Sequence, residues 1–262
     1  MYNTYMYPVL VCIAKREQQY IQEFIRYHLA LGFKRIFLYD NEDEPTYEKL
    51  LQNDLVTVTH YPFNNYEKPV QIMILEHFIQ HFMKDCTHVA HIDIDEFICL
   101  KKHRSIQEFI EEYIVGTTVG IGMNWRFFGS SGNREQTNEP ITQRFTMCQE
   151  KGDTHIKTLF KCDTFLMYRT VHDIMTTKGF IKSTNGKIIR GPWNQHIDFS
   201  VIQLNHYKCK TWPEFQYIRQ RQRADLKGDQ HENVEENFKL YDINEIEELT
   251  AKEFYKHISS QS

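Results

Sequence analysis

Two acidic residues, Asp93 and Asp95, have the type and spacing to bind a divalent cation. Residues two apart on a β-strand point to the same side, so both carboxylates would project together while Ile92 and Ile94 face the core. The lead-in at residues 87–92 (THVAHI) predicts a buried strand, and open α/β sheets bind ligands beyond the carboxyl ends of such strands. Neighbouring carboxylates repel unless a cation bridges them, and hard oxygen ligands suit Mn²⁺ or Mg²⁺. The pattern predicts such a site; an exposed strand end is the alternative.

Two histidines later in the chain could contribute to the same chemistry. His172 and Asp173 stand side by side in a predicted turn, which places an imidazole next to a carboxylate. His206 follows residues 199–204, whose apolar residues alternate with polar ones, so His206 would emerge at the end of a strand. As candidates for a functional site, both segments rank second to the aspartate pair.

A basic segment follows His206. Residues 208–227 contain six Lys or Arg and two Asp or Glu. Lys208 and Lys210 could meet a diphosphate, because ammonium groups attract phosphate oxygens. For most of these charges a solvated helix is the alternative interpretation.

Other catalytic motifs are absent from the sequence. It contains no GxGxxG, no P-loop, no HExxH and no GxSxG. His77 and His81 have the spacing of a metal-binding pair on a helix. We expect them instead to flank the packed face of that helix. The sequence therefore contains no motif of a dinucleotide-binding site, a P-loop site or a serine hydrolase.

Composition excludes further classes of protein. The chain has 262 residues and a formal net charge of −4, and nucleic-acid binders depend mostly on an excess of basic residues, so no nucleic-acid partner is expected. No apolar stretch approaches the roughly 20 residues of a transmembrane helix, and the first ten residues do not resemble a secretory signal. The six cysteines include no CxxC pair, which predicts reduced, packed thiols and a cytoplasmic location.

The elements that would position these residues alternate between strand and helix. Short apolar runs predict strands, and apolar residues at helical spacing predict helices. Strands are expected at residues 9–14, 35–39, 55–60, 89–94 and 119–128, and helices at 21–32, 70–82, 105–113, 212–225 and 244–257. Residues 129–140 are rich in turn formers and predict a loop.

This order predicts an α/β fold with a mostly parallel sheet flanked by helices. We expect a single domain over residues 1–262. Residues 1–100 would form its nucleotide-binding half, and residues 101–262 its irregular acceptor-side half with the C-terminal helices.

Several segments in consistent order resemble glycosyltransferase family 92 and related family 2-like glycosyltransferases. The resemblance covers roughly residues 8–225. It rests on a YH-x-x-x-G segment, a YDN turn, the HIDIDEF block, a W-x-x-F-G-S-S-G stretch and an NHY segment. The matching residues are Tyr27, His28, Gly32, Tyr39, Asp40, Asn41, Gln71, Asp93, Asp95, Trp125, Asn205, His206 and Tyr207.

The resemblance implies a GT-A fold that binds a nucleotide sugar, with UDP as the expected nucleotide. Asp40 would then contact the nucleoside, and Asp93 and Asp95 would lie by the ribose, the metal and the diphosphate. His206 would complete the shell of a Mn²⁺ or Mg²⁺ ion, with His172 as the alternative. Further residues expected in the donor site are Ala14, Lys15, Glu17, Gln71, Ile94, Lys208 and Lys210.

The implied reaction transfers the sugar to a hydroxyl of a glycan, a lipid-linked or a protein-linked acceptor. Breaking the sugar–phosphate bond leaves a nucleoside diphosphate, and Lys157 is a further cation that could assist its departure. Transfer with inversion needs a carboxylate that deprotonates the acceptor hydroxyl. Asp173 is the first candidate, and Asp153 and Asp198 are alternatives.

Two other functions fit the same residues. A non-catalytic module that binds a nucleotide sugar or a glycan would keep the same fold. A metal-dependent phosphohydrolase would use Asp93 and Asp95 to release inorganic phosphate.

Overall fold

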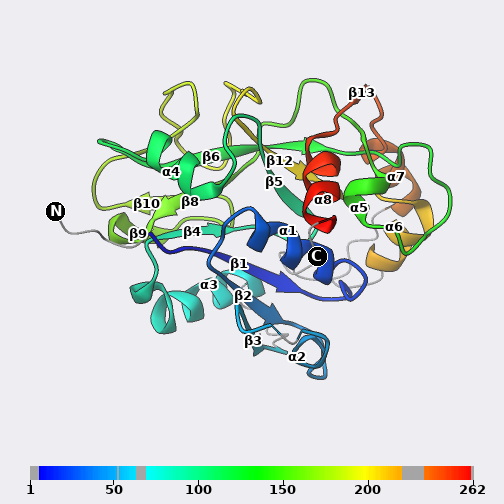
Figure 1. Ribbon diagram of the computed structural model, residues 1–262, viewed down its shortest axis with the longest axis horizontal. Coiled ribbons are helices and arrows are strands. Elements are labelled where there is room, and N and C mark those ends of the chain that lie inside the picture. Colours follow the sequence, from blue (N-terminus) through cyan, green and yellow to red (C-terminus); the bar gives the residue numbers. More distant parts are fainter. Residues whose placement is uncertain (1–5, 52, 63–68, 220–232, 261–262) are drawn as a thin grey trace.

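A computed structural model of the protein describes residues 6–51, 53–62, 69–219 and 233–260 (Figure 1). Its strands are β1 (Pro8–Ala14), β2 (Arg35–Asp40), β3 (Val56–His60), β4 (His88–His91), β5 (Glu96–Leu100), β6 (Thr118–Phe127), β7 (Met147–Cys148), β8 (Ile156–Lys161), β9 (Phe165–Tyr168), β10 (Ile174–Thr176), β11 (Phe180–Lys182), β12 (Ile202–His206) and β13 (Ile246–Glu247). Its helices are α1 (Ile21–Ala30), α2 (Tyr47–Leu50), α3 (Val70–His81), α4 (Ile106–Tyr113), α5 (Ile141–Arg144), α6 (Trp212–Arg219), α7 (Val234–Tyr241) and α8 (Thr250–Ser259).

One large sheet connects the two halves of the chain. Its strand order is β3-β2-β1-β4-β8-β6-β12-β5, and β11 pairs with β6. Strands β3, β2, β1 and β4 are parallel, whereas β8 runs antiparallel between β4 and β6. Strand β12 is parallel to β6, and β5 is antiparallel to β12. The prediction of an α/β fold with a mostly parallel sheet flanked by helices is confirmed.

Strand β1 is buried on both faces, as its continuous apolar run predicts. Leu10 and Cys12 pack in the core cluster that contains α1. Val9 and Val11 pack in the cluster on the other face, which contains α3. Figure 1 shows these two helices on opposite sides of β1. Alternation along one strand therefore fixes both layers of helices around the N-terminal half of the sheet.

Several predicted elements of the second half are also confirmed. The side chain of Ser105 accepts a hydrogen bond from the backbone N–H of Glu108 at the start of α4, which satisfies one of the free donors of that helix end. The strand predicted over 119–128 is β6, and His206 is the last residue of β12. Residues 129–140 contain neither a helix nor a strand.

The strand predicted over residues 89–94 ends earlier, at His91. The backbone N–H of Asp93 donates to the carboxylate of Glu96 (2.9 Å), and the N–H of Glu96 donates to the carbonyl of Asp93 (3.0 Å). These two bonds close a turn that redirects the chain into β5. The prediction that Asp93 and Asp95 share one face of a strand is therefore wrong, because they lie in the turn that follows it.

The helix predicted over residues 244–257 is wrong in its first part. Ile246 pairs with Cys148 in a short antiparallel sheet, and α8 begins only at Thr250. The carboxylate of Glu248 accepts hydrogen bonds from the N–H and the hydroxyl of Thr250, which supports the helix start there. The helix predicted over 212–225 is described to Arg219, and the rest of it lies outside the described residues.

The cysteines behave as predicted for packed thiols. All six are free, and five of them are buried. Burial raises the pKa of the Cys99 thiol to about 12, so it packs as a neutral group. Of the helices in the described ranges, none is long and apolar enough to span a membrane.

His28 is a buried histidine of α1 that must stay neutral. Its side chain packs among Phe24, Tyr27 and Phe97. Because Nδ1 lies 2.9 Å from the carbonyl oxygen of Phe24, it is the protonated nitrogen and donates there. Nε2 then accepts from the backbone N–H of Ile98 at 3.3 Å. Burial lowers the pKa of His28 from 6.5 to about 3.

This histidine predicts a loss of stability in acid. Below pH 6.5 the unfolded chain gains a proton at His28 that the folded chain does not bind, so the free energy of unfolding falls as pH drops toward 3. The slope is about 1.4 kcal/mol per pH unit. His28→Phe should therefore lose about 2 kcal/mol less than the parent protein between pH 7 and pH 5, measured by urea unfolding. Equal losses in both proteins would show that His28 is not the titrating group.

Candidate functional site

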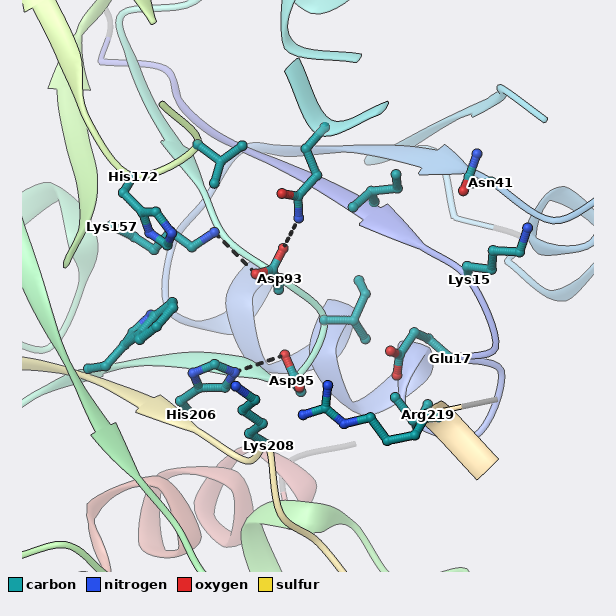
Figure 2. Close-up of a pocket in the computed structure, with 16 residues that line it drawn as sticks. Lys15, Glu17, Asn41, Asp93, Asp95, Lys157, His172, His206, Lys208 and Arg219 are labelled. Carbon is teal, nitrogen blue, oxygen red and sulfur yellow. Dashed lines mark hydrogen bonds and ion pairs between the residues drawn. The ribbon is translucent and has the colours of Figure 1, made fainter. Parts of the chain in front are cut away.

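A cavity of about 220 Å³ lies beyond the carboxyl ends of β1, β2 and β4. This is the edge at which open α/β sheets bind ligands, and residues from both halves of the chain contribute to it. Figure 2 shows Asp93 and Asp95 at its centre. The lining residues are Ile13, Lys15, Glu17, Asn41, Gln71, Asp93, Ile94, Asp95, Trp125, Lys157, Val171, His172, His206, Lys208, Ile218 and Arg219.

Asp93 lies between an amide and a buried ammonium group. Its carboxylate accepts a hydrogen bond from Nε2 of Gln71 (3.0 Å) and one from Nζ of Lys157 (3.1 Å). Burial is the largest influence and would raise the pKa of Asp93, but Lys157, His91 and His206 together outweigh it and the pKa is lowered. Asp93 is therefore ionised, and it already has one cationic partner.

Lys157 on β8 is fully buried, which is rare for a lysine. Burial would lower its pKa, but the carboxylates of Asp93 and Glu96 raise it, so the ammonium stays charged. Nζ of Lys157 lies 3.9 Å from Oε2 of Glu96. This lysine therefore supplies a permanent positive charge beneath the aspartate pair.

Asp95 faces a different set of partners (Figure 2). Oδ1 of Asp95 lies 3.6 Å from Nε2 of His206, and Oδ2 lies 3.7 Å from Nζ of Lys210. Burial lowers the pKa of His206 despite the opposing charge of Asp95, so the imidazole is neutral near pH 7. A neutral imidazole is the form that binds a metal ion.

His172 lies on the same side of the cavity as Lys157 (Figure 2). Its Nδ1 lies 3.0 Å from the carbonyl oxygen of Ile156 and donates to it, so Nε2 is the unprotonated nitrogen. Burial, followed by the charge of Lys157, lowers the pKa of His172 to about 4. Both candidate histidines of the sequence thus line the cavity in the neutral form.

Further cations line the cavity on the side of α6 and of the loop after β1. Lys15 and Lys208, both expected from the sequence, lie there together with Arg219 of α6. Nζ of Lys208 lies 3.7 Å from the ring centroid of Tyr241, which orients the ammonium by a cation–π contact. These groups suit a polyanionic ligand such as a diphosphate.

Some lining residues were not singled out by the sequence analysis. Asn41 belongs to the YDN turn and Trp125 opens the W-x-x-F segment. Both motifs support the resemblance to the family, but neither motif by itself predicts a ligand contact for these two residues. Arg219 lies in the basic segment, where nothing in the spacing separates it from the solvated charges.

Asp40 and Ala14 are not among the lining residues of the cavity. The Asp40 side chain is fully buried, and its carboxylate accepts from the backbone N–H groups of Thr46 (2.7 Å) and Tyr47 (3.0 Å). The carboxylate thereby supports the start of α2, which the sequence did not predict. The nucleoside contact expected of Asp40 stays a prediction, while the next residue, Asn41, lies at the cavity.

Asp173, the expected base, is also outside the cavity lining. Its Oδ2 accepts from Nε of Arg169 (2.7 Å), and its Oδ1 accepts from the hydroxyl of Thr170 (2.8 Å). Lys210 is likewise absent from the lining and reaches the site only through Asp95. The catalytic role of Asp173 stays a prediction, but both of its oxygens are occupied.

Two other segments singled out by the sequence do not contribute to the cavity lining. His77 and His81 pack against each other with tilted rings whose centroids are 4.3 Å apart, and Nδ1 of His77 lies 2.9 Å from the hydroxyl of Tyr39. The loop at 129–140 is bound to the segment after α7 instead, since the N–H of Ser130 donates to Oδ1 of Asp242 (2.7 Å).

The residues of the aspartate pair fit a divalent cation by donor type. Asp93 and Asp95 offer carboxylate oxygens, and His206 offers a neutral imidazole whose Nδ1 is buried without a hydrogen-bond partner among the described residues. Within the described ranges, however, no three His, Cys, Asp or Glu side chains are grouped to hold a metal ion. Magnesium-like ions usually bind one or two carboxylates together with substrate phosphates, so such a site would be completed by the ligand.

Comparison with known proteins gives a consistent result. The sequence model of glycosyltransferase family 92 matches residues 7–254. A glycosyltransferase family 92 protein of Oryza sativa subsp. japonica is 25% identical over 216 residues, covering 80% of this chain and 34% of its own. One of Arabidopsis thaliana is 23% identical over 232 residues, covering 84% of this chain and 38% of its own. The chain thus spans little more than a third of these curated relatives.

A comparison of structures gives a more distant similarity. A crystal structure of a putative glucose-1-phosphate thymidylyltransferase from Bacillus anthracis in complex with a sucrose aligns with a TM-score of 0.35 and 10% sequence identity. The alignment covers 61% of this chain and 72% of that chain.

Proposed function

Because this chain belongs to glycosyltransferase family 92, we propose that it transfers a sugar from a UDP-sugar to a hydroxyl acceptor. The acceptor hydroxyl belongs to a glycan, a lipid-linked or a protein-linked group, and the transfer inverts the sugar configuration. The observation that supports this proposal is the cavity, which combines the aspartate pair with Lys15, Lys208 and Arg219 at the ligand-binding edge of the sheet.

The residues of the cavity divide the work of donor binding. Lys15, Lys208 and Arg219 attract the diphosphate, and their charge stabilises the nucleoside diphosphate as it leaves. Asp93, Asp95 and His206 would hold a Mn²⁺ or Mg²⁺ ion, which offsets the negative charge on the diphosphate when it is bound. Gln71 and Lys157 fix the orientation of the Asp93 carboxylate through the two hydrogen bonds described above.

Product analysis separates this function from the two alternatives. A glycosyltransferase supplied with UDP-glucose and a divalent cation releases UDP and either free or transferred sugar. A phosphohydrolase would instead cleave the diphosphate of UDP-glucose to UMP and glucose 1-phosphate, or release inorganic phosphate from UDP, and a non-catalytic binding module would release nothing. The family supports the first outcome.

UDP should bind at least about tenfold more tightly with Mn²⁺ than with EDTA, which corresponds to about 1.4 kcal/mol. Without a cation, the carboxylate oxygens of Asp93 and Asp95 repel the diphosphate at close range, even though Lys157 and Lys210 balance their formal charge. A bound Mn²⁺ ion would add two positive charges at this point. Isothermal titration calorimetry measures both affinities.

Uridine serves as the control, because it lacks the phosphates and should bind equally in both conditions. Equal affinities for UDP with and without Mn²⁺ would contradict a cation at the aspartate pair.

A further inference from the structure

Next to the donor cavity lies a row of aromatic rings that none of the assignments above uses. Trp125 lines the cavity, and its indole stacks on His155 with ring centroids 5.2 Å apart. Trp193 also packs against His155, edge to face, with ring centroids 5.9 Å apart. Trp193 is 53% exposed, whereas most tryptophans in a folded domain are largely buried. The imidazole of His155 thus contacts both a tryptophan of the cavity and a tryptophan of the surface.

The tautomer of His155 is fixed by Asp153. Nδ1 of His155 lies 2.7 Å from Oδ1 of Asp153, and the same oxygen accepts the backbone N–H of His155 (2.8 Å). Because a carboxylate only accepts, Nδ1 carries the proton and Nε2 carries the lone pair. Within the described part of the chain Nε2 makes no hydrogen bond, and the side chain is 40% exposed. This is the histidine–carboxylate arrangement of a general base.

The segment that carries this pair is rigidly held. The side-chain amide of Asn124 donates to the backbone carbonyls of Asp153 (3.0 Å) and Asn194 (3.1 Å). Asn194 returns a hydrogen bond from its own amide to Oδ1 of Asn124 (2.8 Å). Both asparagines are buried, so one closed network fixes His155 and the loop of Trp193 to strand β6.

Trp125 adds a hydrogen-bond donor without a partner next to His155. Its indole Nε1 is buried and has no hydrogen-bond partner among the described residues. A buried N–H without a partner is costly, so an oxygen atom of a bound ligand or a water would satisfy it. The exposed ring of Trp193 offers an apolar face, and the C–H groups of a pyranose pack on such faces.

We propose, on the basis of the proposed transfer reaction, that this row is the acceptor subsite for a sugar and that His155 is the base. The acceptor packs against Trp193, and its hydroxyl oxygen attacks C1 of the donor sugar while Nε2 of His155 takes the hydroxyl proton. The new bond joins that oxygen to C1. The bond between C1 and the phosphate oxygen breaks, and its electron pair leaves with UDP. Asp153 is a positioning residue that stabilises the imidazolium.

The competing carboxylates are less suited to this role. Asp173 is bound by Arg169 and Thr170, as described above. Asp198 accepts from the hydroxyl of Thr184 (3.2 Å) and from the N–H of Ser200 (2.9 Å). Asp153, the remaining alternative from the sequence, acts through His155.

The test measures UDP affinity and sugar transfer from UDP-glucose, UDP-galactose and UDP-N-acetylglucosamine. The acceptors are the methyl glycosides of glucose, galactose, mannose, fucose and N-acetylglucosamine, with a serine-containing peptide as a hydroxyl that is not a sugar. His155→Gln should bind UDP as the parent protein does, yet transfer about 10²–10⁴-fold more slowly. Imidazole added to His155→Ala should restore part of the rate, which a purely structural role would not allow. His196→Gln is the matched control and should transfer normally.

Trp193→Ala should raise the KM for the acceptor about three- to tenfold and leave the KM for the donor unchanged. Phe180→Ala removes another exposed aromatic side chain and should change neither constant.

Each contrary result identifies a different failure. A parent protein that binds no UDP and uses no donor overturns the proposed function itself. A parent that binds UDP but transfers to no glycoside, or only to the peptide, overturns the sugar subsite. Full transfer by His155→Gln, together with a loss in Asp173→Asn, would return the base to Asp173.

Discussion

Replacing Asp95 with asparagine should reduce sugar transfer at least about 10²-fold and weaken UDP binding in the presence of Mn²⁺. Asparagine keeps the size of the side chain but removes the charge that attracts a divalent cation. Asp95 lines the cavity and pairs with His206 and Lys210, so the variant loses the negative charge that both of them face. UDP titration with Mn²⁺ and single-turnover transfer measure the two effects separately.

Two further variants make this result interpretable. His206→Ala should act in the same direction but more mildly, because a water molecule can replace an imidazole as a ligand. Asp85→Asn removes a carboxylate that is exposed and lies outside the cavity lining, so both measurements should stay at the parent values. If Asp95→Asn is fully active, a metal-dependent mechanism is wrong for this protein, and Asp95 only pairs with its cationic neighbours.

Replacing Arg144 with methionine should lower the free energy of unfolding by about 3–5 kcal/mol. Nη2 and Nη1 of Arg144 bind the carboxylate of Glu214 at 2.7 and 3.1 Å, and both side chains are almost fully buried. Glu214 also accepts from the hydroxyl of Tyr20 (2.8 Å) and the N–H of Thr211 (3.1 Å). Without the guanidinium, a buried carboxylate loses its compensating charge. Urea unfolding measures the change.

An exposed ion pair on α7 provides the matched control. Lys239 and Glu235 form a contact of the same length, 2.7 Å, but their side chains are 70% and 66% exposed. Lys239→Met should therefore leave the urea concentration at the midpoint of unfolding unchanged. The double variant Arg144→Met/Glu214→Leu should recover part of the loss, since it removes the uncompensated charge. A loss below about 1 kcal/mol in Arg144→Met would mean that Glu214 is rehydrated or protonated at little cost.

The ion pair of Arg144 and Glu214 also helps to position a residue of the cavity. Glu214 and Arg219 belong to the same helix, α6, and Arg219 lines the cavity while Glu214 anchors the helix. We therefore expect Arg144→Met to weaken UDP binding even where the protein stays folded.

Most elements in the first hundred residues can be read from the sequence itself, although α2 and β5 cannot. Residues 9–14 are apolar without a break and rich in β-branched side chains, which is typical of a strand covered on both faces, and the structure shows that strand between α1 and α3. The spacing of apolar residues in 70–82 likewise requires a helix, because only a helical period places them on one face. These patterns are local, so the sequence alone reveals them.

The sequence also shows that the aspartate pair follows a buried strand, but it does not show the backbone conformation of the pair. A strand end followed by two carboxylates was evident, whereas the turn closed by Glu96 depends on a hydrogen bond that periodicity does not encode. For the same reason the sequence suggested one helix over 244–257, although pairing of Ile246 with Cys148 converts its first part into a strand.

Only the tertiary structure decides which charges meet. Lys157 reaches Asp93 from 64 residues away because β8 inserts next to β4, and the sheet order is not visible in any local pattern. The same holds for the candidate base. The sequence places both Asp173 and Asp153 close to a histidine, but folding engages Asp173 with Arg169 and brings the Asp153–His155 pair beside Trp193. Contacts between distant segments depend on how the sheet is assembled, and that assembly is a property of the whole chain.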